Sequence, residues 1–237
     1  MSAIPELLER RSAMRAWLHS EAVPSTTHVK LCGMSREEDV DAVVQAHPAM
    51  CGFIVDFPKS HRSVSPVRLA ELTGRLHTAE QSATSRAPIA AVGVFVDKDV
   101  ADVARIVHAC ELDIVQLHGH ETPGYVAELR RALPETGIIQ AFRVHGAADV
   151  QAACDSAADI VLLDSGQGSG ETFDWSLVGQ VMRPFLLAGG LTPGNVGQAI
   201  EAVAPWGVDM SSGIETDSVK DASKMQAAMA AVKGARA

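Results

Sequence analysis

A cysteine and an aspartate end two apolar runs of this sequence, and together they could move protons on one substrate. Cys32 ends the run VKLC and Asp164 ends the run IVLLD. A thiolate can act as a general base and a neutral carboxyl as a general acid, provided that their surroundings shift both pKa values toward neutrality. A cysteine is also a common small buried side chain, and an aspartate a common helix cap. The residue types alone leave both interpretations open.

Two glycine- and serine-rich turns further along the chain are suited to binding a phosphate. The segments AGGLTPGN (188–195) and MSSGIE (210–215) place small residues directly after apolar runs. Their backbone N–H groups can approach an anion closely, and a following helix N-terminus adds partial positive charge. A glycine after a strand also serves tight turning alone, but two such turns favour a phosphate site. The residues expected there are Gly189, Gly190, Ser211, Ser212 and Gly213.

Eight short apolar runs must position these groups, and helical patterns separate them. Several runs are continuously apolar, as in parallel strands that helices cover. The runs occupy residues 29–33, 50–56, 89–97, 113–119, 137–144, 159–165, 184–190 and 207–213. Such an alternation forms either an open doubly wound sheet or a closed barrel. The length of 237 residues, the count of eight and the turns after the last two runs favour an α/β fold with one (β/α)8 TIM barrel.

The segments between the runs show the apolar spacing of amphipathic helices. The helix expected from Ser35 to His47 opens with a capping-box pattern, because Glu38 follows Ser35 by three residues. Apolar residues three or four positions apart predict three more helices, and the C-terminal segment predicts a closing one. Those apolar positions are Val103, Ile106 and Val107; Val126, Leu129 and Leu133; and Val196, Ile200 and Val203.

The first 27 residues are expected to form a helical extension to a barrel at 28–237. Apolar side chains within 5–20 fall on one side of the expected helix. They are Leu7, Leu8, Met14, Trp17 and Leu18. We expect this helix to pack over the exterior of the barrel or over its N-terminal mouth, in preference to forming a dimer contact.

The charge balance argues against several kinds of partner. The chain carries 20 Lys and Arg against 29 Asp and Glu, a formal net charge of −9. Nucleic acids and anionic membranes need a basic face, so neither is an expected partner. No segment reaches the ~20 apolar residues of a membrane span or resembles a signal peptide, which predicts a cytoplasmic protein. The four cysteines show no C-x-x-C spacing, so we expect free thiols and no zinc.

In a β/α barrel, functional groups lie at the C-terminal ends of the strands. This rule places Cys32 and Asp164 on different sides of one mouth and adds His118 as a positioning or hydrogen-bonding residue. Side chains alternate along a strand, so Lys30 shares a face with Cys32, and the eighth strand carries Asp209 beside it in a closed barrel. We predict that Lys30 and Asp209 pair below the thiol, leaving a net charge near zero there.

These residues and their neighbours closely resemble the phosphoribosylanthranilate isomerase family of tryptophan biosynthesis. The similarity runs in the family's order from residue 29 to about residue 226, nearly the whole expected barrel. Its most specific part is KLCGMS with FPKSHR downstream. The other matching segments are GFIVDF, VGVFVD, VQLHGHE, QAFRV, VLLDSGQGSGETFDW, LLAGGLTPGNV, GVDMSSGIE and VKDASKM.

The resemblance implies an Amadori rearrangement of N-(5-phosphoribosyl)anthranilate to a 1-(carboxyphenylamino)-deoxyribulose phosphate. Asp164 would be the general acid that opens the furanose ring, and Cys32 the general base that takes the C2 proton of the resulting Schiff base. Arg62 would contact the anthranilate end, since a planar guanidinium suits an aromatic face and a carboxylate. The backbone of Gly190, Ser212 and Gly213 would hold the phosphate. No metal or cofactor is expected, and the chain is expected as a monomer or homodimer.

Three features depart from the family's pattern. Only eight residues separate Asp164 from Phe173, which is short for a loop that resembles a lid over the substrate. Asp56 with Phe57, and Ser63 after the arginine, alter the apolar wall expected around anthranilate. The N-terminal extension has no counterpart in the family's core pattern.

Other functions of the same scaffold fit less well. An indole-glycerol-phosphate synthase calls for lysine-rich strand ends, which this sequence lacks. A bifunctional histidine/tryptophan isomerase would have two similar halves and paired aspartates, whereas the first strand here ends in Cys32. A non-catalytic barrel that binds a phosphorylated ligand would not need both proton-transfer groups beside both phosphate turns.

Overall fold

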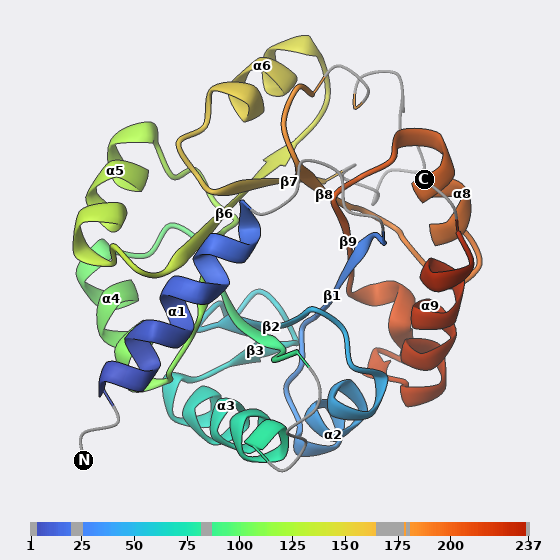
Figure 1. Cartoon of the computed structure of the whole chain (residues 1–237), viewed down its shortest axis with the longest axis horizontal. Coiled ribbons are helices and arrows are strands. Elements are labelled where there is room, and N and C mark those ends of the chain that lie inside the picture. The colour runs from blue at the N-terminus through green and yellow to red at the C-terminus, as the bar shows by residue number, and fades with distance from the viewer. Residues whose placement is uncertain (1–3, 20–25, 82–86, 165–177, 179–180, 236–237) are drawn as a thin grey trace.

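The computed structural model describes residues 4–19, 26–81, 87–164, 178 and 181–235. Within these residues, eight parallel strands close into a barrel, which confirms the predicted (β/α)8 fold (Figure 1). The strand β1 closes it by pairing with both β2 and β9. The barrel strands are β1 (His28–Cys32), β2 (Met50–Val55), β4 (Ala90–Phe95), β5 (Ile114–Leu117), β6 (Gly137–Arg143), β7 (Ile160–Asp164), β8 (Phe185–Ala188) and β9 (Gly207–Met210).

Helices surround the strand barrel, and each helix that the apolar spacing predicted is present (Figure 1). The surrounding helices are α2 (Glu37–Ala46), α3 (Pro66–Gln81), α4 (Val100–Ala109), α5 (Pro123–Ala132), α6 (Ala147–Asp155), α8 (Val196–Val203) and α9 (Ala222–Gly234). The smaller elements are β3 (Ser63–Val64), the 3₁₀ helix η1 (Ser212–Ile214) and an antiparallel hairpin of β10 (Glu215–Thr216) and β11 (Val219–Lys220). Among the described residues, no helix is long and apolar enough to cross a membrane.

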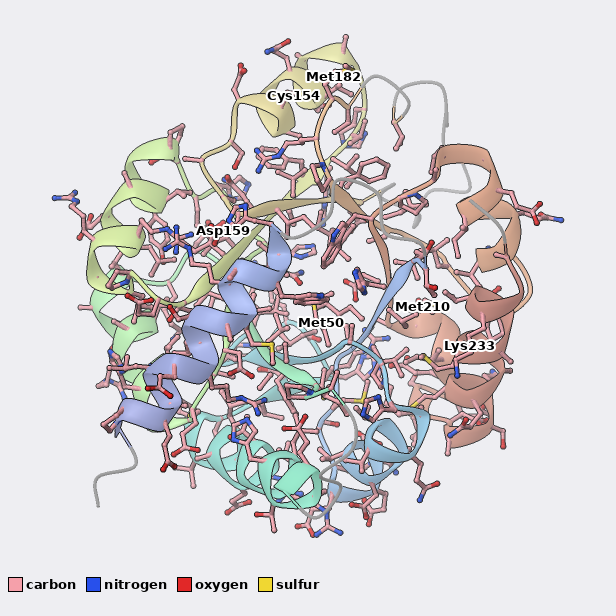
Figure 2. All side chains as sticks on the ribbon, viewed as in Figure 1. Met50, Cys154, Asp159, Met182, Met210 and Lys233 are labelled. Atoms are coloured by element: carbon pink, nitrogen blue, oxygen red, sulfur yellow. The ribbon has the colours of Figure 1, made fainter. Side chains whose placement is uncertain are left out.

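Alternate side chains of the strands enter two apolar layers. On β5, Ile114 joins the cluster inside the barrel, whereas Val115 joins the cluster between the strands and the helices. Met50 at the start of β2 is fully buried in the inner cluster and lies near the middle of the ring (Figure 2). Because both faces of these strands are covered, the strands appear in the sequence as continuous apolar runs.

The helix α1 (Ile4–Leu18) lies across the N-terminal end of the barrel (Figure 1). Met14 and Leu18 are buried in the inner apolar cluster, so of the two expected positions, the barrel exterior and the N-terminal mouth, the helix takes the second. Leu18 fits closely there because a Cβ on Gly137 would lie 2.8 Å from its side chain. Leu8, expected on the same face, is instead 40% exposed, since the apolar contact is confined to the second half of α1.

Ion pairs between α1 and the starts of two strands fix this helix in place. Arg10 Nε donates to Asp113 Oδ1 at 2.8 Å just before β5. Arg15 Nε donates at 3.2 Å to Asp159 Oδ1 before β7, and Figure 2 shows Asp159 beside the C-terminal end of α1. Each aspartate also accepts hydrogen bonds from backbone N–H groups, so the pairs join α1 to the barrel itself.

The cap of α2 differs from the predicted one by one residue. The carboxylate of Asp39, not that of Glu38, accepts hydrogen bonds from the backbone N–H groups of Ser35 and Arg36, both at 3.0 Å. Arg36 is the N-cap residue, so the helix starts one position later than the Ser35 pattern indicates. Ser35 with Glu38 and Arg36 with Asp39 both have the three-residue spacing of a capping box, so the sequence pattern does not show which residue caps the helix.

Candidate active site

A cavity of about 580 Å³ opens at the C-terminal end of the barrel. It gathers side chains from strands that are far apart in the sequence, as the barrel rule predicts. The polar and glycine residues that line it are Cys32, Ser60, Gln116, His118, Arg143, Asp164, Gly189, Gly190, Asp209, Ser211 and Ser212. Seven of the nine candidate site residues from the sequence are therefore together, and the other two, Arg62 and Gly213, lie outside this lining.

Cys32 ends β1 and reaches the floor of the cavity. Its residue is only 5% exposed, and its partner in register on β2 is Gly52. A Cβ on Gly52 would lie 2.7 Å from Cys32 Sγ and 3.0 Å from Lys30 Nζ. The glycine therefore leaves the space that the thiol and the ammonium group share.

The predicted ion pair below the thiol is confirmed. Lys30 Nζ lies 3.0 Å from Asp209 Oδ1, and the lysine side chain is fully buried. Burial lowers the pKa of Lys30, but the charges and hydrogen bonds of Asp209 and Cys32 raise it to about 12. Lys30 is therefore a permanent cation inside the barrel.

The thiol of Cys32 is protonated more firmly than an exposed cysteine. Burial raises its pKa, the charge of Lys30 lowers it, and the charge of Asp209 raises it again; the net result is a raised pKa. Desolvation opposes the thiolate more than the single nearby cation favours it. The resting group at neutral pH is the thiol.

Asp164 ends β7 and faces the cavity from the other side of the mouth. Its side chain is 22% exposed, and its Oδ2 lies 3.7 Å from His118 Nε2. The other ring nitrogen of His118 is 3.0 Å from Gln116 Nε2, whose residue is 1% exposed. Gln116 thus orients the imidazole toward the carboxyl of Asp164. The predicted lid that follows, at 165–172, lies outside the described residues.

The two small-residue turns lie against each other at the rim of the cavity. Gly189 and Gly190 have φ values of 97° and 63°, which strongly favour glycine. A Cβ on Gly213 would lie 1.9 Å from the carbonyl oxygen of Leu191, so this position also accepts only glycine. Asn195 fixes the first turn, because its side chain donates to Gly190 O at 3.1 Å. The two turns are thus packed against each other, and glycine is required at the positions where they meet.

Arg62 is engaged by a residue that the sequence analysis did not single out. Its Nε and Nη2 donate to the two carboxylate oxygens of Glu215, both at 2.6 Å. Lys220 Nζ donates to the same carboxylate at 2.7 Å and to Ser211 O at 2.9 Å. Burial raises the pKa of Glu215, but hydrogen bonds from Arg62 and Lys220 lower it to about 2. The only sequence signal was that Glu215 is the last residue of the MSSGIE segment.

The described part of the chain holds no group of three or more His, Cys, Asp or Glu side chains arranged to bind a metal ion. All four cysteines are free, as expected from their spacing. The chemistry that these residues can supply is proton transfer beside a bound anion, with a thiol and a carboxyl at opposite sides of one cavity.

Comparison with known proteins identifies the family of this chain. The family model for N-(5'-phosphoribosyl)anthranilate isomerase matches residues 29–231. An isomerase of that name from Chromohalobacter salexigens is 38% identical over 220 residues, which are 89% of this chain and 96% of the relative. The Rhodospirillum rubrum isomerase is 39% identical over 224 residues, 88% of this chain and 99% of the relative. This chain belongs to the N-(5'-phosphoribosyl)anthranilate isomerase family.

Solved structures of phosphoribosylanthranilate isomerases share the barrel. The Thermotoga maritima isomerase superimposes with a TM-score of 0.74 at 30% identity, covering 88% of this chain and 99% of that one. A phosphoribosylanthranilate isomerase in complex with reduced 1-(o-carboxyphenylamino)-1-deoxyribulose 5-phosphate gives 0.73 at 30% identity, with the same coverage. The helix α1 precedes the segment that the isomerase family model matches.

Proposed function

We propose that this barrel converts N-(5-phosphoribosyl)anthranilate to 1-(2-carboxyphenylamino)-1-deoxyribulose 5-phosphate, with Cys32 as general base and Asp164 as general acid. The observation that carries the assignment is the position of the two side chains, which come from β1 and β7 and line one cavity. Membership of the isomerase family supplies the substrate. The reaction is an isomerisation, so no co-reactant is required.

The proton transfers follow from this arrangement. Asp164 donates a proton to the furanose oxygen, the C1–O bond breaks, and the anilino nitrogen takes up the positive charge as a Schiff base. Cys32 must first lose its thiol proton to solvent, because only the thiolate is a base. The thiolate then removes the proton from C2, and the electron pair moves into the C1–C2 bond to give an enolamine. Tautomerisation of the enolamine to the ketone completes the rearrangement. The substrate nitrogen serves as the electron sink, so the proposal includes neither a metal nor a cofactor.

The phosphate of the substrate is assigned to the paired turns at the rim. Four of their residues line the cavity, and their small side chains leave backbone N–H groups accessible to an anion. Gly213 contributes through packing of the second turn against the first. The assigned residues are Gly189, Gly190, Ser211, Ser212 and Gly213. His118 is assigned a hydrogen-bonding role between Asp164 and the sugar.

Arg62 is assigned to the anthranilate carboxylate, as the family resemblance implies. Glu215 engages Nε and Nη2 of its guanidinium, and Nη1 is not part of that pair. The half-buried guanidinium is thus held in one orientation, which a bidentate pair achieves better than a single hydrogen bond. Binding through the remaining edge or face of the group does not require the Glu215 pair to break.

We also propose a cytoplasmic protein that is a monomer or homodimer, with residues 1–27 as an extension of a barrel at 28–237. The four cysteines, none of them in a disulfide, support this location, because disulfides are rare in the cytoplasm. The described part of α1 covers the N-terminal mouth of the barrel, which limits the surface available there for a second copy. Light scattering coupled to size-exclusion chromatography measures the mass: a species larger than a dimer contradicts this proposal.

Turnover of purified protein, in a fluorescence assay with the unstable substrate generated in situ, tests the proposed reaction. We expect Cys32→Ala and Asp164→Ala each to lower kcat by at least about 10²-fold, the scale of general acid–base catalysis. Cys154→Ala, a free cysteine away from the cavity, is the matched control and should retain wild-type turnover. Absence of turnover by the wild-type protein, or full activity of either catalytic variant, would contradict the assignment.

A further inference from the structure

Lys220 is a buried cation behind the second phosphate turn, and the proposed reaction gives it no part. Its side chain is 3% exposed. Besides the bond to Glu215, Nζ donates to the backbone oxygen of Ser211 at 2.9 Å and to its hydroxyl at 3.3 Å. Lys220 lies on β11, so these hydrogen bonds join the β10–β11 hairpin to the turn at Ser211.

The same ammonium group reaches the chain directly beside the thiol. Gly33 follows Cys32 and has a φ of 86°. A Cβ there would lie 2.6 Å from Arg62 Cδ, 3.1 Å from Ser211 Oγ and 3.3 Å from Lys220 Nζ. Gly33 is thus the point at which the end of β1, the phosphate turn and the buried lysine meet.

The charged groups around the thiol are unequal in sign. Those that act on it directly are Lys30 from β1, Asp209 from β9 and Lys220 from β11, together with Arg62 before β3. Glu215 from β10 joins them through its ion pairs with Arg62 and Lys220. Cys51 on β2 is a buried neutral thiol, and Asp164 with His118 lies across the cavity. Three cations thus face two anions, whereas the sequence indicated only a balanced Lys30 pair. Arg62 and Lys220 share the single carboxylate of Glu215, so these three groups together carry one positive charge.

We propose that Lys220 is a positioning residue that favours the thiolate of Cys32 and couples this base to the phosphate turn through Ser211. The inference rests on the role of Cys32 in the proposed function. The contacts with Glu215 and Ser211 fix the location of the ammonium charge. For the pKa of Cys32, burial is the main raising influence, and Lys220 joins Lys30 among the groups that lower it.

The rate of alkylation of Cys32 by iodoacetamide, followed over pH by mass spectrometry of its peptide, tests the proposal without requiring turnover. Below the thiol pKa this rate follows the thiolate fraction. Lys220→Met should slow it about threefold or more, and Glu215→Gln should accelerate it by a similar factor. Lys220→Arg retains the charge and should stay near wild type. Lys233→Met, which removes an exposed cation at the outer surface (Figure 2), is the control.

The double variant Lys220→Met/Glu215→Gln separates electrostatics from misfolding of the hairpin. It restores one excess positive charge, so its alkylation profile should return toward wild type. A damaged turn would instead move both single variants in one direction, and the double variant further still. That pattern, or an unchanged profile for Lys220→Met, would overturn the proposal.

Turnover distinguishes this inference from the function on which it rests. If Cys32→Ala is fully active while Lys220→Met slows alkylation, the base assignment fails and the influence of Lys220 on the thiol remains. If Cys32→Ala is inactive, Lys220→Met should move the rise of kcat to higher pH, with partial rescue by Lys220→Arg.

Discussion

The two ends of the barrel use the same strands in opposite ways. At the N-terminal end, Met14 and Leu18 of α1 enter the inner apolar cluster, and Arg10 and Arg15 pair with aspartates at the strand starts. At the C-terminal end, polar and small residues from several strand ends and from the following loops line a cavity of about 580 Å³. The interior of the barrel is filled at the first end, which we call the filled end, although a cavity of about 460 Å³ remains beside Met14 and Trp17 of α1. The interior opens into the active-site cavity at the second, the hollow end. The N-terminal end stabilises the fold, whereas the C-terminal end keeps buried polar groups that lower stability but can do chemistry.

The difference is clearest in how each end treats its buried charges. Asp113 and Asp159 each have arginine partners and backbone donors, which compensate the cost of burial. The charged form of Cys32 is compensated only in part: Lys30 and Lys220 lower the pKa of the thiol, but burial and Asp209 raise it, and the net result is a raised pKa. Stability therefore concentrates at one end, and the capacity to exchange a proton at the other.

Of the variants that test this comparison, Lys30→Met should lower the free energy of unfolding the most. It leaves the Asp209 carboxylate beside the cavity without its 3.0 Å partner, and we expect a loss of about 3–5 kcal/mol in the free energy of unfolding. Urea denaturation measures the loss. Lys30→Met/Asp209→Asn removes both charges and should recover much of it; equal instability of the two variants would contradict an electrostatic origin.

Leu18→Ala tests the filled end in isolation. Leu18 is 1% exposed in the inner cluster, so we expect a loss of about 2–4 kcal/mol of stability with kcat retained at temperatures where the protein is folded. Leu8→Ala, on the exposed side of the same helix, is the matched control and should change stability by less than about 0.5 kcal/mol. A fall in kcat for the folded Leu18 variant would mean that the two ends are not separable.

The smallest expected effect is a loss of stability at low pH, caused by protonation of Glu215 at the hollow end. Glu215 has a lowered pKa of about 2 against an ordinary value of 4.5. The unfolded chain therefore binds more protons between these values, so the stabilisation is complete above pH 4.5 and lost as the pH falls toward 2. We expect a contribution of about 1–2 kcal/mol after solvent screening. Urea denaturation over this pH range should show that the free energy of unfolding of the wild-type protein falls by this amount relative to that of Glu215→Gln as the pH is lowered. Stability curves that stay parallel for the two proteins would contradict the prediction.

Much of the fold was predictable because barrel strands have a simple period and a fixed neighbour order. Alternation along β1 and closure against β9 together predicted the Lys30–Asp209 pair, although 179 positions separate the two residues. The same reasoning brought Cys32 and Asp164 to one mouth. Period and topology thus predict which backbone positions meet, even between distant segments.

Side-chain partners outside the eight barrel strands could not be predicted in this way. Glu215 and Lys220 lie in two-residue strands, too short to show any periodicity. The contacts of Glu215 with Arg62 and Lys220 depend on the path of the hairpin that carries them. The position of α1 was predicted only as one of two surfaces, because its apolar face fits either. The sequence therefore predicted a net charge near zero around the thiol from the Lys30 pair alone, and it missed the charges of Arg62, Glu215 and Lys220.

The most direct test of the central claim is a crystal structure of this protein with reduced 1-(o-carboxyphenylamino)-1-deoxyribulose 5-phosphate. The account predicts the phosphate on the turns at Gly190 and Ser212, Cys32 Sγ within about 3.5 Å of C2, and the Asp164 carboxylate within hydrogen-bonding reach of the former ring oxygen. A phosphate bound elsewhere, or either catalytic side chain too far from the sugar to touch it, would contradict it.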